Sequence, residues 1–114
     1  MELKIKKLEQ DSKMCIVYLE GRLDVHYSTE IEEAINALIK EGYTKLLINL
    51  KKVSYLSSSG LRIFIAIARE LKAKDGKVKL VEMPEAVKKI FIVVELLDMF
   101  EIYNSDDEAI RSFS

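Results

Sequence analysis

Hydrophobic side chains recur along the chain with two different periods, which divide it into strands and helices. Leu3 and Ile5 alternate with lysines, and a second apolar run at positions 15–19 ends at Gly21, so these two strands are predicted to pair as a hairpin. The run at 46–50 is apolar almost throughout, which is typical of a strand covered on both faces at the centre of a sheet. The remaining predicted strands lie at positions 78–81 and, at a sheet edge, 102–103.

Four helices are predicted from apolar side chains that are spaced three and four residues apart. The first begins at Thr29, which has Glu32 in capping-box spacing, and the third begins at Pro84. The last follows Ser105, which has Glu108 in the same spacing. The predicted core faces of the first three helices are Ile31, Ala34, Ile35, Leu38 and Ile39; Leu61, Phe64, Ile65, Ala68 and Leu71; and Val87, Ile90, Phe91, Val94 and Leu97.

The order of the elements, β-β-α-β-α-β-α-β-α, predicts an α/β domain with a mostly parallel central sheet and an N-terminal hairpin. Strand, helix and strand in succession imply parallel crossovers. With 114 residues the chain has room for one domain, so residues 1–114 are predicted to form a single unit.

Composition and charge narrow the classes of function. Hydrophobic residues make up 49% of the chain, which excludes a disordered protein. The net charge of −1 and the scattered basic pairs give no surface for nucleic acid, so no nucleic acid partner is predicted. No signal-peptide pattern and no apolar stretch long enough for the membrane is present, and the single Cys15 suits a reducing compartment. We therefore expect a cytoplasmic protein that does not bind membranes.

The common catalytic and cofactor motifs are missing from the sequence. There is no G-x-x-x-x-G-K-[ST] and no G-x-G-x-x-G, which excludes ATP or NAD binding by those routes. One histidine, His26, and one cysteine do not make a set of metal ligands. Ser58, His26 and Asp24 could formally supply a catalytic triad, but the G-x-S-x-G elbow is absent. The sequence therefore predicts no enzyme, no cofactor and no metal.

Three consecutive serines, Ser57, Ser58 and Ser59, lie between the central strand and the second helix. Such a strand-to-helix switch is the usual place for a functional site in an open α/β sheet, and the free N–H groups of the helix start favour an anion. A phosphate on Ser58 or Ser59 would carry about −1.5 to −2 charges and could accept those N–H groups. The purely structural alternative makes Ser57 an N-cap, with the next two serines tolerated in the first turn.

Other residues near this segment are candidates for contact with a partner. Gly60 is expected to keep the surface open to an approaching kinase. Ile63 and Ile67 are four residues apart and displaced from the main core face, so they either dock a partner or are covered by a neighbouring helix. Asp24 by itself has the character of a turn aspartate after a strand.

Three motifs together resemble the STAS domain family, specifically its stand-alone anti-sigma factor antagonists. Gly21–Asp24 is similar to the family's G-x-L-D after the second strand, and Leu50–Leu61 is similar to its hydrophobic strand followed by D-S-[ST]-G-L. Leu97–Tyr103 is similar to its L-x-x-x-F-x-[IV]-Y/F ending. Ser57 stands where the family's pattern has aspartate; serine is also a good N-cap, so the helix start is retained.

The resemblance implies a phosphorylation switch. In the family the serine that corresponds to Ser58 is phosphorylated by an anti-sigma factor that is itself a serine kinase, with Ser59 and Ser57 as the alternatives in this chain. Only the unphosphorylated form binds that partner and so frees the sigma factor. The contact residues predicted for this partner are Asp24, the three serines and Gly60, together with Ile63 and Ile67, which are candidates from the helix pattern alone. A serine phosphatase is an optional second partner.

Two other functions stay open on the sequence. A STAS scaffold or transport accessory subunit would use the same surface constitutively, without a switch. A weak nucleotide-binding module would use the serine-rich helix start to hold the phosphate of a small ligand.

Overall fold

A five-stranded sheet runs through the molecule with its strands in chain order, β1-β2-β3-β4-β5. In this computed structural model, residues 2–113 are described. β1 pairs with β2 in antiparallel fashion, and the other three pairs are parallel, which confirms the predicted hairpin and the mostly parallel sheet. The strands are β1 (Glu2–Lys7), β2 (Met14–Leu23), β3 (Lys45–Leu56), β4 (Lys77–Val81) and β5 (Glu101–Tyr103).

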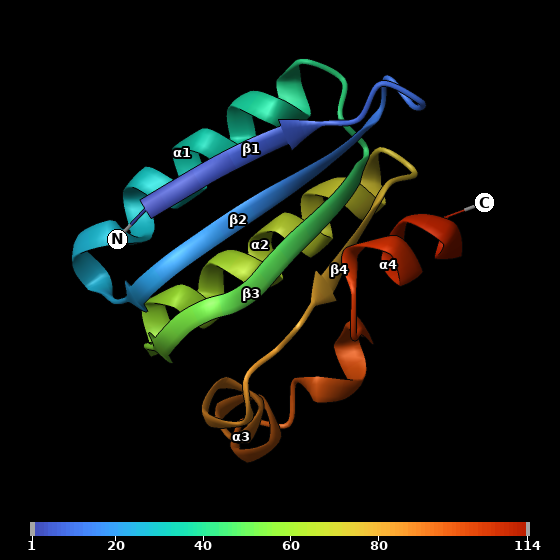
Figure 1. Cartoon of the computed structure of the whole chain (residues 1–114). Helices are drawn as coiled ribbons and strands as arrows, with labels where there is room; N and C mark the ends of the chain where they lie inside the picture. The colour runs from blue at the N-terminus through green and yellow to red at the C-terminus, as the bar shows by residue number, and fades with distance from the viewer. Residues whose placement is uncertain (1, 114) are drawn as a thin grey trace.

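The helices cover the two faces of the sheet unequally. They are α1 (Val25–Lys40), α2 (Ser58–Ala73), α3 (Glu85–Val93), the short 3-10 helix η1 (Leu97–Met99) and α4 (Asp106–Ser112). Apolar side chains of α1, α2 and α3 join one large core with one face of the sheet, whereas α4 packs on a smaller core on the opposite face. Figure 1 shows α1 and α2 behind the sheet, α4 in front of it and α3 beyond one end. None of the helices in residues 2–113 combines the length and the apolarity needed to cross a membrane.

β2 continues past the glycine at which the sequence pattern predicts its end. Gly21 has φ +102°, in the left-handed region, and the register between β2 and β3 shifts on passing from Gly21 to Arg22. The extra residue of this irregularity is Ser54 on β3, and the positive φ that glycine adopts readily lets β2 follow the shifted register without ending. The prediction that Gly21 ends the strand is therefore wrong, and β2 reaches Leu23.

Two predicted helix boundaries are also wrong. α1 begins at Val25 rather than Thr29, because Asp24, five positions before Thr29, has extended backbone and caps the helix. α3 ends at Val93, so Val94 is exposed instead of joining the core face, and Leu97 lies in η1. The cap predicted for α4 is confirmed, since the hydroxyl of Ser105 accepts the N–H of Glu108 at 3.1 Å.

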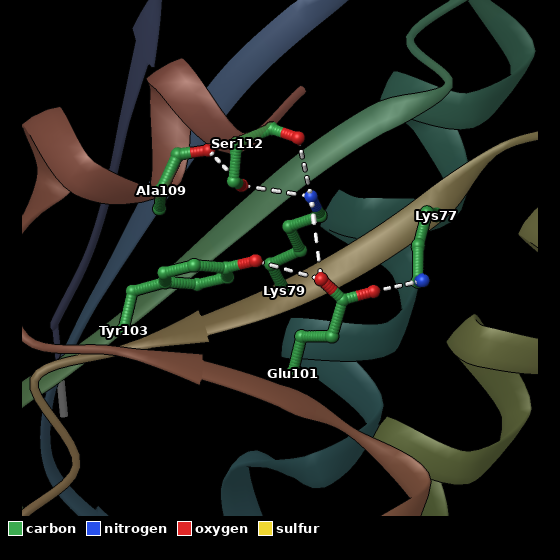
Figure 2. A network of polar contacts seen from close by, with 6 residues as sticks. All are labelled: Lys77, Lys79, Glu101, Tyr103, Ala109 and Ser112. Atoms are coloured by element: carbon green, nitrogen blue, oxygen red, sulfur yellow. Dashed lines mark hydrogen bonds and ion pairs between the residues drawn. The ribbon is translucent and has the colours of Figure 1, made fainter. Parts of the chain in front are cut away.

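A buried lysine fastens the C-terminal end of α4 to the sheet (Figure 2). The Nζ of Lys79, on β4, donates to the hydroxyl of Ser112 at 2.7 Å and to its carbonyl oxygen at 3.2 Å. The same ammonium lies 3.5 Å from a carboxylate oxygen of Glu101 and 4.0 Å from the ring centroid of Phe113. A charge removed from water has to be paired in this way.

The other end of α4 is held by a second polar contact. The hydroxyl of Tyr18 donates to the carboxylate of Asp106 at 2.7 Å, and the side-chain amide of Asn49 donates to the other oxygen at 2.9 Å. Burial, followed by the hydrogen bond to Asp106, raises the pKa of Tyr18 to about 12. Hydrogen bonds at both ends thus supplement the small apolar face of this seven-residue helix.

Candidate partner-binding site at the start of two helices

The starts of α1 and α2 lie together at the carboxyl ends of the parallel strands, which we call the carboxyl edge of the sheet. β2 and β3 run parallel, and their last residues, Leu23 and Leu56, are opposite each other in the register. The N–H of Ser57 donates to the carbonyl of Leu23 at 2.9 Å, which ties the start of α2 to the end of β2. Figure 1 shows both helices starting where the arrowheads of β2 and β3 end. Two positive dipole ends therefore meet at the carboxyl edge, the usual place for a site in this class of fold.

Each of these helices begins with a side-chain cap. The carboxylate of Asp24 accepts the N–H of His26 at 3.1 Å, and the hydroxyl of Ser57 accepts the N–H of Gly60 at 3.2 Å. Both cap residues have extended backbone, as N-caps do. Asp24 is therefore a helix cap at the site edge rather than a simple turn residue. Ser57 has the structural role that the sequence allowed for it.

Ser58 is the exposed serine of the three. Ser57 and Ser59 are half-buried, and Ser58 is the first residue of α2. In the first turn of α2 the N–H of Gly60 already donates to the Ser57 hydroxyl, whereas the N–H groups of Ser58 and Ser59 have no acceptor within the helix. A phosphate on the Ser58 hydroxyl could therefore be accommodated by local hydrogen bonds, with no change in the core.

Gly60 is buried, so it does not open the surface as the sequence analysis expected. A Cβ at this position would lie 2.6 Å from a methyl carbon of Leu56 and 3.1 Å from the carbonyl oxygen of Leu23. The missing side chain lets the first turn of α2 approach the ends of β2 and β3 closely. Gly60 thus positions the serines rather than contacting a partner itself.

Ile63 and Ile67 also lie in the core rather than on the surface. Their exposed fractions are 3% and 1%, and both belong to the large cluster that joins α2, α1 and the sheet. The neighbouring helix covers the side of α2 that the sequence left ambiguous. The hypothesis that these two isoleucines form a docking surface is therefore corrected, and a partner has to contact other residues.

Three exposed side chains at the same edge were not predicted from the sequence. The guanidinium of Arg22 lies over the ring of Tyr55, 4.3 Å from its centroid, and Val25 is exposed at the first position of α1. Placing the cap at Asp24 would have drawn attention to Val25. No sequence signal pairs Arg22 with Tyr55, because that contact depends on the register across the bulge in β3 at Ser54. The edge therefore presents a hydroxyl, a cation and apolar surface, which are groups that suit contact with another protein.

No group of histidine, cysteine, aspartate or glutamate side chains within residues 2–113 could hold a metal ion.

The STAS domain family model matches residues 5–109, which is nearly the whole chain. The chain belongs to the STAS domain family.

Relatives and solved structures agree with this membership. An anti-sigma-B factor antagonist of Staphylococcus aureus is 28% identical over 102 residues, which are 90% of this chain and 94% of the relative. The anti-sigma factor antagonist SpoIIAA, solved in its unphosphorylated form, is similar with a TM-score of 0.85 and 25% identity over 98% of this chain and 96% of that one. The Bacillus cell fate determinant SpoIIAA in its phosphorylated form has a TM-score of 0.78 and 24% identity, covering 99% of this chain and 100% of that one.

The STAS fold therefore confirms the predicted α/β architecture with its order of elements. Each of the three motifs that carry the resemblance forms a defined element or cap of this fold. Gly21–Asp24 supplies the left-handed glycine opposite the bulge and the cap of α1, Leu50–Leu61 forms the second part of β3 and the start of α2, and Leu97–Tyr103 forms η1 and β5.

Proposed function

We propose that this STAS domain is an anti-sigma factor antagonist that binds its anti-sigma factor through the edge where α1 and α2 begin, and that phosphorylation of Ser58 abolishes that binding. The observation that carries the proposal is the exposed Ser58 at the first position of α2, beside the capped start of α1. The partner in this proposal is a serine kinase, and a serine phosphatase reverses the modification. The chain itself acts by binding and catalyses no reaction.

The relatives support the class of partner. The Staphylococcus aureus relative is named for antagonism of an anti-sigma factor, and the SpoIIAA structures carry the names of an unphosphorylated and a phosphorylated form. Those names describe the relatives. Their transfer to this chain rests on similarity over nearly the full length and on the serine at the start of α2.

Electrostatics explains how one modification could act as a switch without refolding. A phosphate adds about −1.5 to −2 charges and strong acceptor oxygens. At the start of a helix the negative charge is favourable to the free chain. In a complex, however, the same charge has to be desolvated or placed against the partner, and a cost of several kcal/mol corresponds to roughly a thousandfold loss of affinity.

The first test is phosphopeptide mapping after incubation with ATP and the candidate kinase. We expect one modified peptide, carrying phosphate on Ser58, and no modification of Ser58→Ala. Ser59→Ala is the matched control and should be modified like the wild type. Modification of Ser57 or Ser59 alone would contradict the assignment of the switch residue.

The second test is binding of Ser58→Asp to the same anti-sigma factor. We expect affinity to fall by a factor on the order of a thousand, while the free energy of unfolding stays unchanged or rises by about 0.3–1 kcal/mol, since an acidic residue is favourable in the first turn. Calorimetric titration gives the affinity, and urea denaturation gives the stability. Tight binding of Ser58→Asp, together with an absence of phosphorylation, would identify a constitutive scaffold instead.

A further inference from the structure

A row of exposed apolar side chains lies at the end of α3 and in η1. Val93 has an exposed fraction of 80% and Met99 one of 52%, and Ile92 and Val94 are exposed beside them. These four side chains are called the ridge. Single exposed apolar residues are normal, whereas four within eight positions concentrate exposed apolar surface in one segment, as at sites of contact with another protein. The same segment carries two exposed acids, Glu95 and Asp98, and no basic residue.

A groove lined by apolar and basic side chains lies next to the ridge. It has a volume of about 580 Å³ and lies between the second half of α2, the start of β4 and η1. Val78 and Phe100 are buried at its base, and Met99 of the ridge forms part of its wall. The remaining lining residues are Ala68, Arg69, Lys72, Gly76 and Lys77.

The charged side chains of the groove are opposite in sign to those of the ridge segment. Lys77 forms an ion pair with Glu101, but Arg69 and Lys72 have no charged partner within residues 2–113. Glu95 and Asp98 on the ridge segment likewise have none there. Lys88 and Lys89 precede Ile92 and Val93 by four positions on α3 and border the helical end of the ridge, whereas the two charged residues within positions 92–99 are both acidic. An apolar, acidic ridge is thus complementary to an apolar, basic groove.

We infer that the chain forms a two-fold symmetric dimer in which the ridge of each copy packs into the groove of the other. Because Met99 belongs to both surfaces, the ridge and the groove are one continuous patch. A patch that carries two complementary halves side by side can meet itself across a two-fold axis, and such a contact closes after two copies. In the dimer Glu95 and Asp98 of one copy face Arg69 and Lys72 of the other.

The dimer is expected to be weak and separate from the proposed switch. The ridge is small, so the dissociation constant should lie above about 1 µM, where association depends visibly on concentration. Ser58 and Lys72 are fourteen positions apart on α2, which corresponds to about 21 Å along the helix. The inference does not rest on the proposed function, and either one can fail without the other.

The first experiment measures sedimentation velocity of the full chain from about 10 µM to about 1 mM. We expect the wild type to shift from monomer to dimer over this range, and Val93→Lys to remain monomeric throughout. Val93 is largely exposed, so this variant should fold normally, which circular dichroism verifies. Val25→Lys, at another exposed valine, is the matched control and should dimerise like the wild type. A chain that is monomeric at the highest concentration, or a dimer that Val93→Lys leaves intact, would refute the inference.

A charge-reversal experiment tests the reciprocal geometry. One variant carries Arg69→Glu with Lys72→Glu in the groove, and the other carries Glu95→Lys with Asp98→Lys on the ridge. Each alone should be at least tenfold weaker as a dimer than the wild type, because its ridge and groove have the same sign. An equimolar mixture should dimerise again, because both contacts of the mixed pair then join opposite charges.

The control for this experiment replaces the ridge variant with Glu30→Lys and Glu33→Lys on α1, where both acids are exposed. This variant has the same change in net charge but keeps the wild-type ridge and groove, so it should dimerise with itself. The readout is therefore the heterodimer with a fluorescently labelled groove variant, which should stay at least tenfold weaker than in the mixture with the ridge variant. Recovery with the α1 variant would show that only net charge matters and would overturn the proposed contact. Larger, open-ended assemblies of the wild type would overturn the closed dimer.

Discussion

Glu101 shows how strongly a single carboxylate on the edge strand is held. Its two oxygens are contacted by Lys77, by Lys79 at 3.5 Å and by the hydroxyl of Tyr103, which donates at 2.7 Å (Figure 2). Lys77, followed by Tyr103, lowers the pKa of Glu101 to about 2. The acid is thus ionised in the folded chain at pH values where it is protonated in the unfolded chain.

This shift predicts how the stability depends on pH. Because the pKa of Glu101 is lower in the folded chain, its contribution to stability is present above the unfolded value of about 4.3 and is lost as the pH falls toward 2. Glu101→Gln should therefore have a lower free energy of unfolding than the wild type near pH 7. The difference should be less than about 1 kcal/mol, because 38% of the side chain is exposed. The difference should shrink between about pH 4 and 2 in thermal unfolding. An unchanged difference across that window would contradict this origin of the shift.

At the scale of elements, Gly60 controls how closely α2 approaches the sheet. A methyl group at this position would press on Leu56, which is buried, and on the backbone carbonyl of Leu23. The same contact positions Ser57, whose N–H donates to that carbonyl, and therefore also the exposed Ser58. The geometry of the candidate site thus depends on the packing beneath it.

Gly60→Ala is expected to lower the free energy of unfolding by about 1–3 kcal/mol, the usual cost of an extra methyl group in a filled core. Urea denaturation measures this change. Ser59→Ala, in the same turn, is the matched control and should alter stability by no more than about 0.5 kcal/mol. If the two variants were equally stable, the close approach at Gly60 would have no energetic role.

At the scale of the whole molecule, Cys15 reports on global unfolding. It lies on β2 between Lys7 of β1 and Leu46 of β3 and has an exposed fraction of 0%. Burial raises the pKa of its thiol to about 11, so both access and ionisation oppose reaction in the folded chain. We expect no labelling by a disulfide reagent near pH 8 until the sheet opens as a whole.

The measurement follows thiol labelling and circular dichroism together through a urea titration. The two transitions should coincide, and the chain in high urea should label at once. Labelling well before the loss of secondary structure would show that the hairpin of β1 and β2 opens separately.

The two proposed surfaces also belong to the scale of the whole molecule. The helix starts at the carboxyl edge suit a partner that is sensitive to charge, and the ridge and groove lie toward the other end of α2. α2 contributes to both surfaces, through Ser58 at its start and through Arg69 and Lys72 in its second half, while the ridge itself lies on α3 and η1.

The sequence alone predicted the features that depend on residues close together in the chain. The order of strands and helices, the N-cap Ser105 and the central position of β3 follow from periodicity and capping, which involve residues near one another in the chain. The serine segment at the start of α2 could be recognised for the same reason, because its position between a buried strand and an amphipathic helix is a local property.

Burial and contact between distant segments required the tertiary structure. Whether Ile63 and Ile67 face a partner or the core depends on where α1 packs, and the contact of Arg22 with Tyr55 depends on the register shift between β2 and β3 at Ser54. The exposure of Val93 depends on where α3 ends against the rest of the fold. Periodicity specifies which residues share a face of an element, but only the packing of the elements decides what covers that face.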